Sequence, residues 1–385
     1  MIKKYIVHEG KGNCIEYLSE KGVNEYFVIL RVDNLPIEES LSILHKQYSE
    51  LFEICVLRES IPVYTRIFLS DVENQSSFVT KSEIYKMLSA GGIRIIGNEP
   101  VDSGKVAIVS YLIKKENHIN ISKIETELYN RLCLKGNSYS MQFICDCGDS
   151  KDRSVGMQSK SIFSTIKENF PDIDFKNELV RTWISIRDID NNYMPFVKER
   201  NNFFDEVSMR YFFPSSTAVE GRSSDPHKLV SIDMISISNI DKAQMSKMEA
   251  HDFMPPTLKY GVSFERGLKV CFGDRAHYHL SGTASIDHNG DILYPDDVKL
   301  QVERALTNVN ALLVNSNINW SNVIYLLFYI RDTKDYEEIQ SVVDGILPDD
   351  IPRLYIKSSI CRPGWLVEVD GIAIGSGDRQ FPDFI

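Results

Sequence analysis

The sequence contains the same helix-and-strand pattern twice. Residues 301–332 begin with QVERALTNVNALL and end with YLLFYIRD, and residues 158–188 begin with QSKSIFSTIKENF and end with TWISIRD. In both segments, apolar residues first recur with helical spacing and then form a short apolar run typical of a buried strand. The first glutamine and the final aspartate are 31 positions apart in one copy and 30 in the other. The matching spacing predicts a duplicated structural unit.

A further strand follows each copy, and a weaker third copy lies near the N-terminus. KLVSIDMISI at 228–237 resembles WLVEVDGIAI at 365–374. Near the start, YTRIFLSDVENQSSFV at 64–79 and KVAIVSYLI at 105–113 resemble the two strands of the unit. Three units of this length are each the size of a small domain, and the first is the most degenerate. The predicted boundaries are 1–135, 136–250 and 251–385.

Each complete unit is predicted to run hairpin, helix, strand, helix and final strand. In the third unit the hairpin covers AHYHLSGTASIDHNGDILY, with its turn at Asn289-Gly290. The second helix, YEEIQSVVDGIL, ends before Pro348. This order predicts an α+β fold in which helices cover one face of a mixed sheet.

Composition and charge exclude several functions. With 43% hydrophobic residues the chain can bury a sizeable core, while a net charge of -11 without a Lys/Arg block disfavours nucleic-acid binding. The most apolar run, 322–330, is too short to cross a membrane. Seven cysteines without framework spacing, and an N-terminus without a secretory signal, indicate a cytoplasmic protein. Cys145 and Cys147 lack a second pair, and His277 and His279 lack a third ligand, so no metal is predicted. The sequence also contains no phosphate-binding loop, and no organic cofactor is predicted.

Over roughly the last 125 residues, the strings HLSGTASI, QVERALTNVNALL, VIYLLFYIRDTKDY and WLVEVDGIAI resemble the Rid (YjgF) superfamily. VRTWISIRDI, FPSSTAVEG and ICRPGWLVEVDG further resemble the chorismatases, which carry a Rid-like C-terminal domain. The resemblance implies chorismate-mutase-like units and a small-molecule site in each cleft between neighbouring units. Three tandem units would then form a pseudo-trimer within one chain, as a monomer or a homodimer.

One acidic position distinguishes the copies. The final strand of the third unit has Glu368, where the second has Ser231 and the first is predicted to have Ser110. A partly buried carboxyl has a raised pKa and can act as a general acid, although a strand glutamate is more commonly solvated. The resemblance places the key carboxylate at Glu368. Asp233 and Asp370 occur in both copies and are predicted to be structural.

Arginines are the candidate ligands for a substrate carboxylate. Arg362 lies in the turn CRPGW and is the leading candidate, because a guanidinium binds carboxylates through two hydrogen bonds; the alternative is a surface arginine. Arg353 lies 15 positions before Glu368, the spacing that the resemblance to Rid imine deaminases implies, but without their small-residue context; Ser216 is its counterpart in the second unit. Cys361 is predicted to line the cleft.

The remaining candidates are predicted to form the walls of the site. Ser281, Gly282 and Thr283 resemble the strand whose backbone lines the pocket in the family, with a simple bulge as the alternative. Trp183 is also compatible with a core position. The other wall candidates, from the neighbouring unit and from the start of the third unit, are Arg181, Trp183, Thr217, Gly221, Tyr260 and Arg275.

The resemblance to chorismatases implies a hydrolase acting on chorismate, a small anionic metabolite with two carboxylates and an enol ether. Protonation of its methylene carbon by Glu368 and addition of water would release pyruvate, leaving a hydroxybenzoate or a dihydroxycyclohexadiene carboxylate. The alternatives are a Rid-type imine or enamine deaminase and a metabolite-binding protein without catalysis. The acidic charge balance disfavours the ribonuclease activity once associated with the superfamily.

Overall fold

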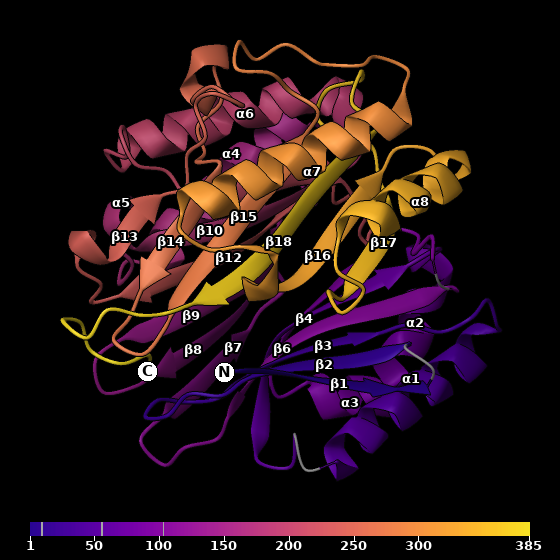
Figure 1. The fold of residues 1–385 in the computed structure, drawn as a ribbon, viewed down its shortest axis with the longest axis vertical. Coiled ribbons are helices and arrows are strands. Elements are labelled where there is room, and N and C mark those ends of the chain that lie inside the picture. Colours follow the sequence, from indigo (N-terminus) through magenta and orange to yellow (C-terminus); the bar gives the residue numbers. More distant parts are fainter. Residues whose placement is uncertain (9–10, 55–56, 103) are drawn as a thin grey trace.

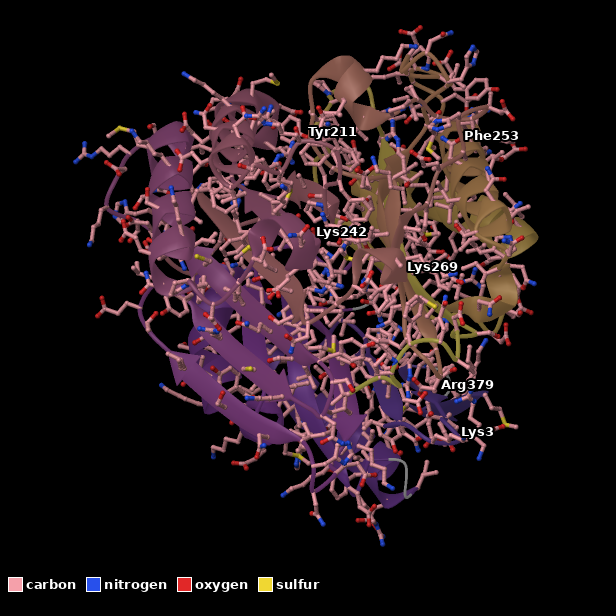
Figure 2. All side chains as sticks on the ribbon, turned by 90° about the vertical axis from the view of Figure 1, so that its left-hand side faces the viewer. Lys3, Tyr211, Lys242, Phe253, Lys269 and Arg379 are labelled. Carbon is pink, nitrogen blue, oxygen red and sulfur yellow. The ribbon has the colours of Figure 1, made fainter. Side chains whose placement is uncertain are left out.

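The computed structural model describes residues 1–8, 11–54, 57–102 and 104–385, which form three six-stranded sheets with the same strand order (Figure 1). The orders are β1-β2-β3-β6-β4-β5, β7-β8-β9-β12-β10-β11 and β13-β14-β15-β18-β16-β17. The helices lie outside the sheets, and side chains fill the space between the layers (Figures 1 and 2). The side chains of Lys3, Lys242 and Arg379, which are labelled in Figure 2, are exposed to solvent. The predicted α+β fold with three tandem units is confirmed.

The first unit carries its helices between its third and fourth strands and between its fourth and fifth. Asp71 begins the second helix by accepting a hydrogen bond from the Asn74 amide, as a helix N-cap does. Its elements are β1 (Ile2–Val7), β2 (Gly12–Tyr17), β3 (Glu25–Leu30), α1 (Ile37–Glu53), β4 (Ser60–Leu69), α2 (Val72–Lys81), α3 (Glu83–Leu88), β5 (Gly92–Ile96) and β6 (Val106–Lys114).

The second unit repeats the strand order, with a four-residue helix added before its fourth strand and one 18-residue helix in place of α2 and α3. Its elements are β7 (Asn120–Glu125), β8 (Asn130–Lys135), β9 (Ser140–Gly148), α4 (Val155–Asn169), α5 (Phe175–Glu178), β10 (Leu179–Ile186), α6 (Ile189–Glu206), β11 (Ser215–Glu220) and β12 (Val230–Ser238). Strand membership therefore differs from the predicted boundary at residue 135, because β7 and β8 already belong to the second sheet. The exposed, polar β7 carries little of the alternation that marks a strand in sequence.

The third unit contains four short 3₁₀ helices besides its two α-helices in the part of the chain that the structure describes. Its elements are η2 (Lys242–Gln244), β13 (Met245–Lys247), η3 (Thr257–Tyr260), β14 (Gly267–Cys271), β15 (Ala276–Ala284), α7 (Val298–Asn315), η4 (Trp320–Asn322), β16 (Val323–Ile330), η5 (Thr333–Asp335), α8 (Tyr336–Ile346), β17 (Arg353–Lys357) and β18 (Val367–Gly375). The predicted hairpin was only partly right. Both edges of β15 are occupied by β14 and β18, so the return after Asn289-Gly290 forms only one bridge, between Ile286 and Ile292.

Strand β16 is buried on both faces, which explains its continuous apolar sequence. Leu326, Phe328 and Ile330 pack outward in the core beneath the helices, whereas Leu327 and Tyr329 pack inward against the other sheets. Because successive side chains point to opposite faces, a strand buried on both faces must be apolar throughout. No helix among the described residues is long and apolar enough to cross a membrane.

The three units close into a ring around a pseudo-threefold axis. Asn98 of the first unit donates hydrogen bonds to the carbonyls of Glu220 (2.9 Å) and Lys357 (3.0 Å), one in each of the other units. Units that contact one another head to tail form a closed ring when three successive rotations about the axis complete a full turn. Isolated β-bridges join each unit to the next, pairing Gly97 with Arg222, Val219 with Ile360 and Ile356 with Pro100.

Candidate active site

Strand register identifies the equivalent positions of the three units. The final strand of each unit (β6, β12 or β18) pairs with the strand that comes fourth in the chain order of that unit (β4, β10 or β16). Each of these pairings is interrupted at the same place by one extra residue. Counted from this irregularity, Glu368, opposite Tyr329, corresponds to Ser231, opposite Ser185, as predicted.

The first-unit counterpart of Glu368 is Ala107, opposite Phe68, and the prediction of Ser110 was wrong. Ser110 pairs with Thr65 and corresponds to Gly371. The apolar strand around Ser110 offers no marker that fixes the alignment in sequence. Both other units still lack a carboxylate at this position.

A cavity of about 280 Å³ lies between the second and third units and contains Glu368. It is bounded by β11, β15, β18, helix α6 and the loop that precedes β18. The side chains that matter for its chemistry are Glu368, Arg200, Arg266, Arg362, Cys361, Tyr193 and Ser216. We call this space the open cleft.

The carboxyl of Glu368 is buried and in the acid form at neutral pH. The side chain is 4% exposed, and no hydrogen bond from a described residue reaches its carboxyl. Burial raises the pKa of Glu368 to about 8; the negative charge of Asp370 adds to this, and Arg181 and Arg266 oppose it. A carboxyl that keeps its proton at pH 7 is a competent general acid.

Gly282 allows this carboxyl to lie against strand β15. A Cβ atom at position 282 would collide with the carboxyl oxygen Oε1 of Glu368. Glycine is therefore required for close packing at this point and not for an unusual backbone conformation. Gly282, which was predicted to line the site, lies in the wall of the open cleft.

Arg200 is a cavity residue that the sequence prediction missed. It lies on α6, is 3% exposed, and its Nε and Nη2 atoms have no hydrogen-bond partner among the described residues. A buried cation without an acceptor is costly, so an anion in the cavity is its natural partner. The sequence does carry a signal: Arg200 continues the buried stripe of Tyr193, Phe196 and Val197, where an apolar residue is expected.

Two further arginines flank the open cleft. Arg266 donates to the carbonyl of Pro255 through Nε (3.2 Å) and Nη2 (3.0 Å). Arg362 donates to the carbonyl of Gly290 (3.0 Å), and its guanidinium carbon lies 4.8 Å from the ring centre of Trp365. The structure thus brings the predicted Arg362 into the site, where three guanidinium groups favour an anionic ligand.

Arg353 lies elsewhere. It is on β17 and contacts Asp344 at 3.3 Å, and it does not line the open cleft. Register confirms that Ser216 is its counterpart, and Ser216 does line the cleft. Because each fifth strand faces the next unit, Arg353 faces the first unit and not Glu368.

Cys361 lines the cleft as predicted, but as a thiol. Burial raises its pKa to about 12, with the negative charge of Glu368 adding to the effect. A thiol that holds its proton at neutral pH is a poor nucleophile. Cys361 therefore contributes shape to the cleft.

Ser281 and Thr283 serve the framework. Ser281 donates to the carbonyl of Glu265 (2.6 Å) and accepts from the amide of Ser216 (2.8 Å), joining the second and third units. Thr283 donates to the carbonyl of Ser281 (3.0 Å). Gly221 follows β11 and packs against Ser185, outside the cleft lining.

Arg181, Trp183 and Thr217 were predicted to form the opposite wall of the site, but none of them lines the open cleft. All three donate to the same oxygen of Asp370, at 2.8, 3.2 and 2.7 Å respectively. Tyr329 also donates to this oxygen, at 3.3 Å. These residues form a buried cluster around Asp370, which agrees with the structural role predicted for that aspartate.

Arg275 is also outside the open cleft. It is fully buried where the first and third units meet, and it forms ion pairs with Glu25 and Asp274. Tyr260 ends η3, and its side chain lies outside the described residues. Among the described residues, no three His, Cys, Asp or Glu side chains form a group that could hold a metal ion.

Comparison with known proteins agrees with this architecture. Residues 270–375 match the family model of Endoribonuclease L-PSP. A crystal structure of chorismatase is 13% identical, with 81% of this chain and 93% of that chain covered and a TM-score of 0.62. Two single-unit structures also match, each over 98% or more of its own length: E. coli TdcF with bound serine (22% identity, 34% of this chain, TM-score 0.29) and RidA from the Antarctic bacterium Psychrobacter (17%, 33%, 0.28). The last unit therefore matches the Rid family model over residues 270–375, and the three tandem Rid-like units share the fold of chorismatase.

Proposed function

We propose that the open cleft is the active site of a chorismatase-like hydrolase that releases pyruvate from chorismate. The observation that carries the proposal is a buried, protonated carboxyl, Glu368, in the same cavity as Arg200, a buried guanidinium whose Nε and Nη2 have no hydrogen-bond partner among the described residues. The first supplies a proton, and the second requires an anion. The fold shared with chorismatase supports the choice of substrate.

The reaction needs one proton donor and carboxylate anchors. Glu368 transfers its proton to the methylene carbon of the enolpyruvyl group, which leaves an oxocarbenium-like centre beside the new carboxylate of Glu368. Water adds to that centre and returns a proton to Glu368. The resulting hemiketal breaks its bond to the ring oxygen as its hydroxyl proton passes to that oxygen, which gives pyruvate and the hydroxylated ring.

The arginines hold the substrate during these steps. Arg200, Arg266 and Arg362 offer guanidinium groups for the two carboxylates of chorismate. A cavity of about 280 Å³ is near the lower end of the range for small-molecule sites, so it suits a compact ring with short substituents. Asp370 keeps a negative charge behind Glu368, which favours retention of its proton.

The Rid-type deaminase is the second candidate, because the last unit matches that superfamily. Deamination needs a carboxylate that activates water, and the raised pKa of Glu368 favours the protonated state instead. Arg353, which that resemblance places on the substrate carboxylate, lies outside the cleft. The structure therefore supports proton donation better than water activation.

The decisive experiment incubates the purified protein with chorismate. We expect pyruvate, detected by NADH oxidation with lactate dehydrogenase, and one aromatic or dihydroaromatic acid in equal amount by chromatography and mass spectrometry. Parallel incubation with an amino-acid oxidase, its amino acid and semicarbazide tests for imine hydrolysis through a decrease in the semicarbazone. Semicarbazone loss without pyruvate formation would favour the deaminase, and no turnover with a chorismate-induced melting shift would favour a binding protein.

A further inference from the structure

A second, smaller cavity lies on the pseudo-threefold axis and shares no lining residue with the open cleft. Its volume is about 50 Å³, and strands from all three sheets enclose it. We call it the axial cavity. Six of the side chains that line it are aromatic: Phe27, Tyr64, Tyr111, Phe143, Trp183 and Tyr325.

Three buried polar atoms at this cavity have no hydrogen-bond partner among the described residues. They are Nη1 of Arg181, Oδ1 of Asp370 and Nε2 of His279. The three side chains are 1%, 1% and 5% exposed. Leaving buried donors and acceptors unpaired is costly, and most such groups in folded proteins have a protein or water partner. Three at one cavity indicate a missing ligand.

The charges around the cavity select the type of ligand. Arg181 already pairs with Asp370 at 2.8 Å, and Glu25 brings a second negative charge, paired with His277 at 2.9 Å and with Arg275. His279 is neutral, because burial, His277 and Arg181 hold its pKa well below the usual value. Each carboxylate is thus already paired, and Arg66, which donates to the hydroxyl of Tyr325 at 3.2 Å, adds a positive charge that disfavours a cation. The unpaired atoms include a donor on Arg181 and an acceptor on Asp370, so a neutral ligand that both accepts and donates hydrogen bonds fits best.

We propose that the axial cavity binds ordered water that accepts a hydrogen bond from Nη1 of Arg181 and donates to Oδ1 of Asp370 and Nε2 of His279. Three partners are typical of buried water, and the volume exceeds the roughly 10–15 Å³ that one molecule needs. The arrangement requires His279 to carry its proton on Nδ1.

This water links the units and supports the cluster behind the proposed acid. Arg181 belongs to the second unit, and Asp370 and His279 belong to the third, so the water bridges their interface. Asp370 lies two residues after Glu368 on β18, and its other oxygen already accepts four hydrogen bonds. The water donates a hydrogen bond to the remaining carboxylate oxygen of Asp370 and stabilises the negative charge of that side chain.

A high-resolution crystal structure of the whole chain tests the proposal directly. We expect a density peak in the axial cavity within hydrogen-bond distance of all three atoms. An empty cavity would overturn the proposal. Crystals soaked in bromide provide the second arm, because a bromide anomalous peak there would show an anion site and would also overturn it.

Substitution of His279 provides a solution test. His279→Leu removes the acceptor, whereas His279→Gln keeps a polar group that can contact the water. We expect the leucine variant to melt roughly 2 °C or more below the glutamine variant. Equal melting temperatures, with the water peak retained in a crystal of the leucine variant, would show that His279 is not a partner.

Discussion

The open cleft and the cleft between the first and second units are built from equivalent positions but are filled in opposite ways. In the first-second cleft, Arg94 enters from β5 and forms contacts with Asp146 and the hydroxyl of Ser231. Lys228 adds a second ion pair to Asp146 at 3.2 Å. We call this the filled cleft.

Register shows how few exchanges separate the two clefts. Ser231 of the filled cleft replaces Glu368, and Asp146 replaces Gly282. Arg94 takes the position that Thr217 holds on β11. The filled cleft thus carries a guanidinium with its own protein partners, whereas the open cleft has the acid, a cavity, and Arg200, whose Nε and Nη2 have no hydrogen-bond partner among the described residues.

The remaining cleft, between the third and first units, is closed by apolar packing. Ala107, the counterpart of Glu368, belongs to one buried cluster with Ile29 and Leu354. Of three related clefts in the described structure, two use their side chains to hold the ring together and one keeps space for a ligand. Duplication within a single chain permits this division, which identical subunits cannot make.

The largest effect should come from the acid itself. Glu368→Gln removes the transferable proton, and we expect kcat with chorismate to fall about 10³-fold without a lower melting temperature, because the neutral amide resembles the protonated carboxyl. Ser231→Ala is the matched control and should leave kcat unchanged. Equal losses in both variants would contradict the view that only one cleft is an active site.

Replacing Gly282 should have the next largest effect. Gly282→Ala forces its methyl group against Oε1 of Glu368 and displaces the carboxyl, so we expect kcat/KM to fall about 10²-fold. Gly345→Ala in α8 is the control, since a Cβ there meets nothing within 4 Å. It should leave activity unchanged and raise the melting temperature slightly. Full activity in the Gly282 variant would show that the position of Glu368 is not critical.

Replacement of Arg200 or Arg94 by methionine should have different effects, on KM in the first case and on stability in the second. Arg200→Met removes a buried cation that forms no ion pair with a described residue, so we expect KM to rise about 30-fold while the melting temperature stays the same or increases. Arg94→Met breaks pairs that already exist, so it should lower stability by roughly 1–3 kcal/mol and leave KM unchanged. Enzyme kinetics and thermal melting of both variants measure the four quantities. A large stability loss in Arg200→Met would mean that its partner is protein and not ligand.

The pH dependence should follow Glu368. Because the protonated form is the active one and its pKa is about 8, kcat/KM should be level below pH 7 and fall about tenfold per pH unit above the pKa. Its folded pKa lies above the ordinary value of 4.5, so the stability from this group is present at low pH and is lost as pH rises toward 8. Glu368→Gln should abolish that part of the stability change. A rate that rises through pH 8 would instead indicate a base.

The comparison also explains what the sequence could reveal. The repeat, the fold and the single acidic cleft follow from periodicity and from differences between copies, which are local properties. Arg200 was missed because its importance depends on the neighbouring unit that covers it, although its place on an apolar stripe was visible. Arg181 and Thr217 were placed on the correct strands, but strand alternation gives the face of a side chain and not its depth toward the axis.

The smallest predicted effect concerns the Arg-Asp pair at the end of the repeated strand. Arg331 donates to the carbonyls of Ile360 (2.7 Å), Arg362 (3.0 Å) and Trp365 (2.9 Å), and it pairs with Asp190 of α6 at 2.8 Å. It therefore holds the loop of Arg362 against the helix that carries Arg200.

Arg187, its counterpart in the second unit, donates to the carbonyl of Pro226 (2.9 Å), beside the filled cleft. We expect Arg331→Ala to raise KM roughly fivefold with kcat nearly unchanged, because the loop loses its support while Glu368 keeps its position. Arg187→Ala should alter KM less than twofold. Steady-state kinetics at equal folded fractions, checked by thermal melting, separates the two. If both variants changed KM alike, this arginine would support the fold of each unit equally, and the difference between the clefts would not extend to the ends of their strands.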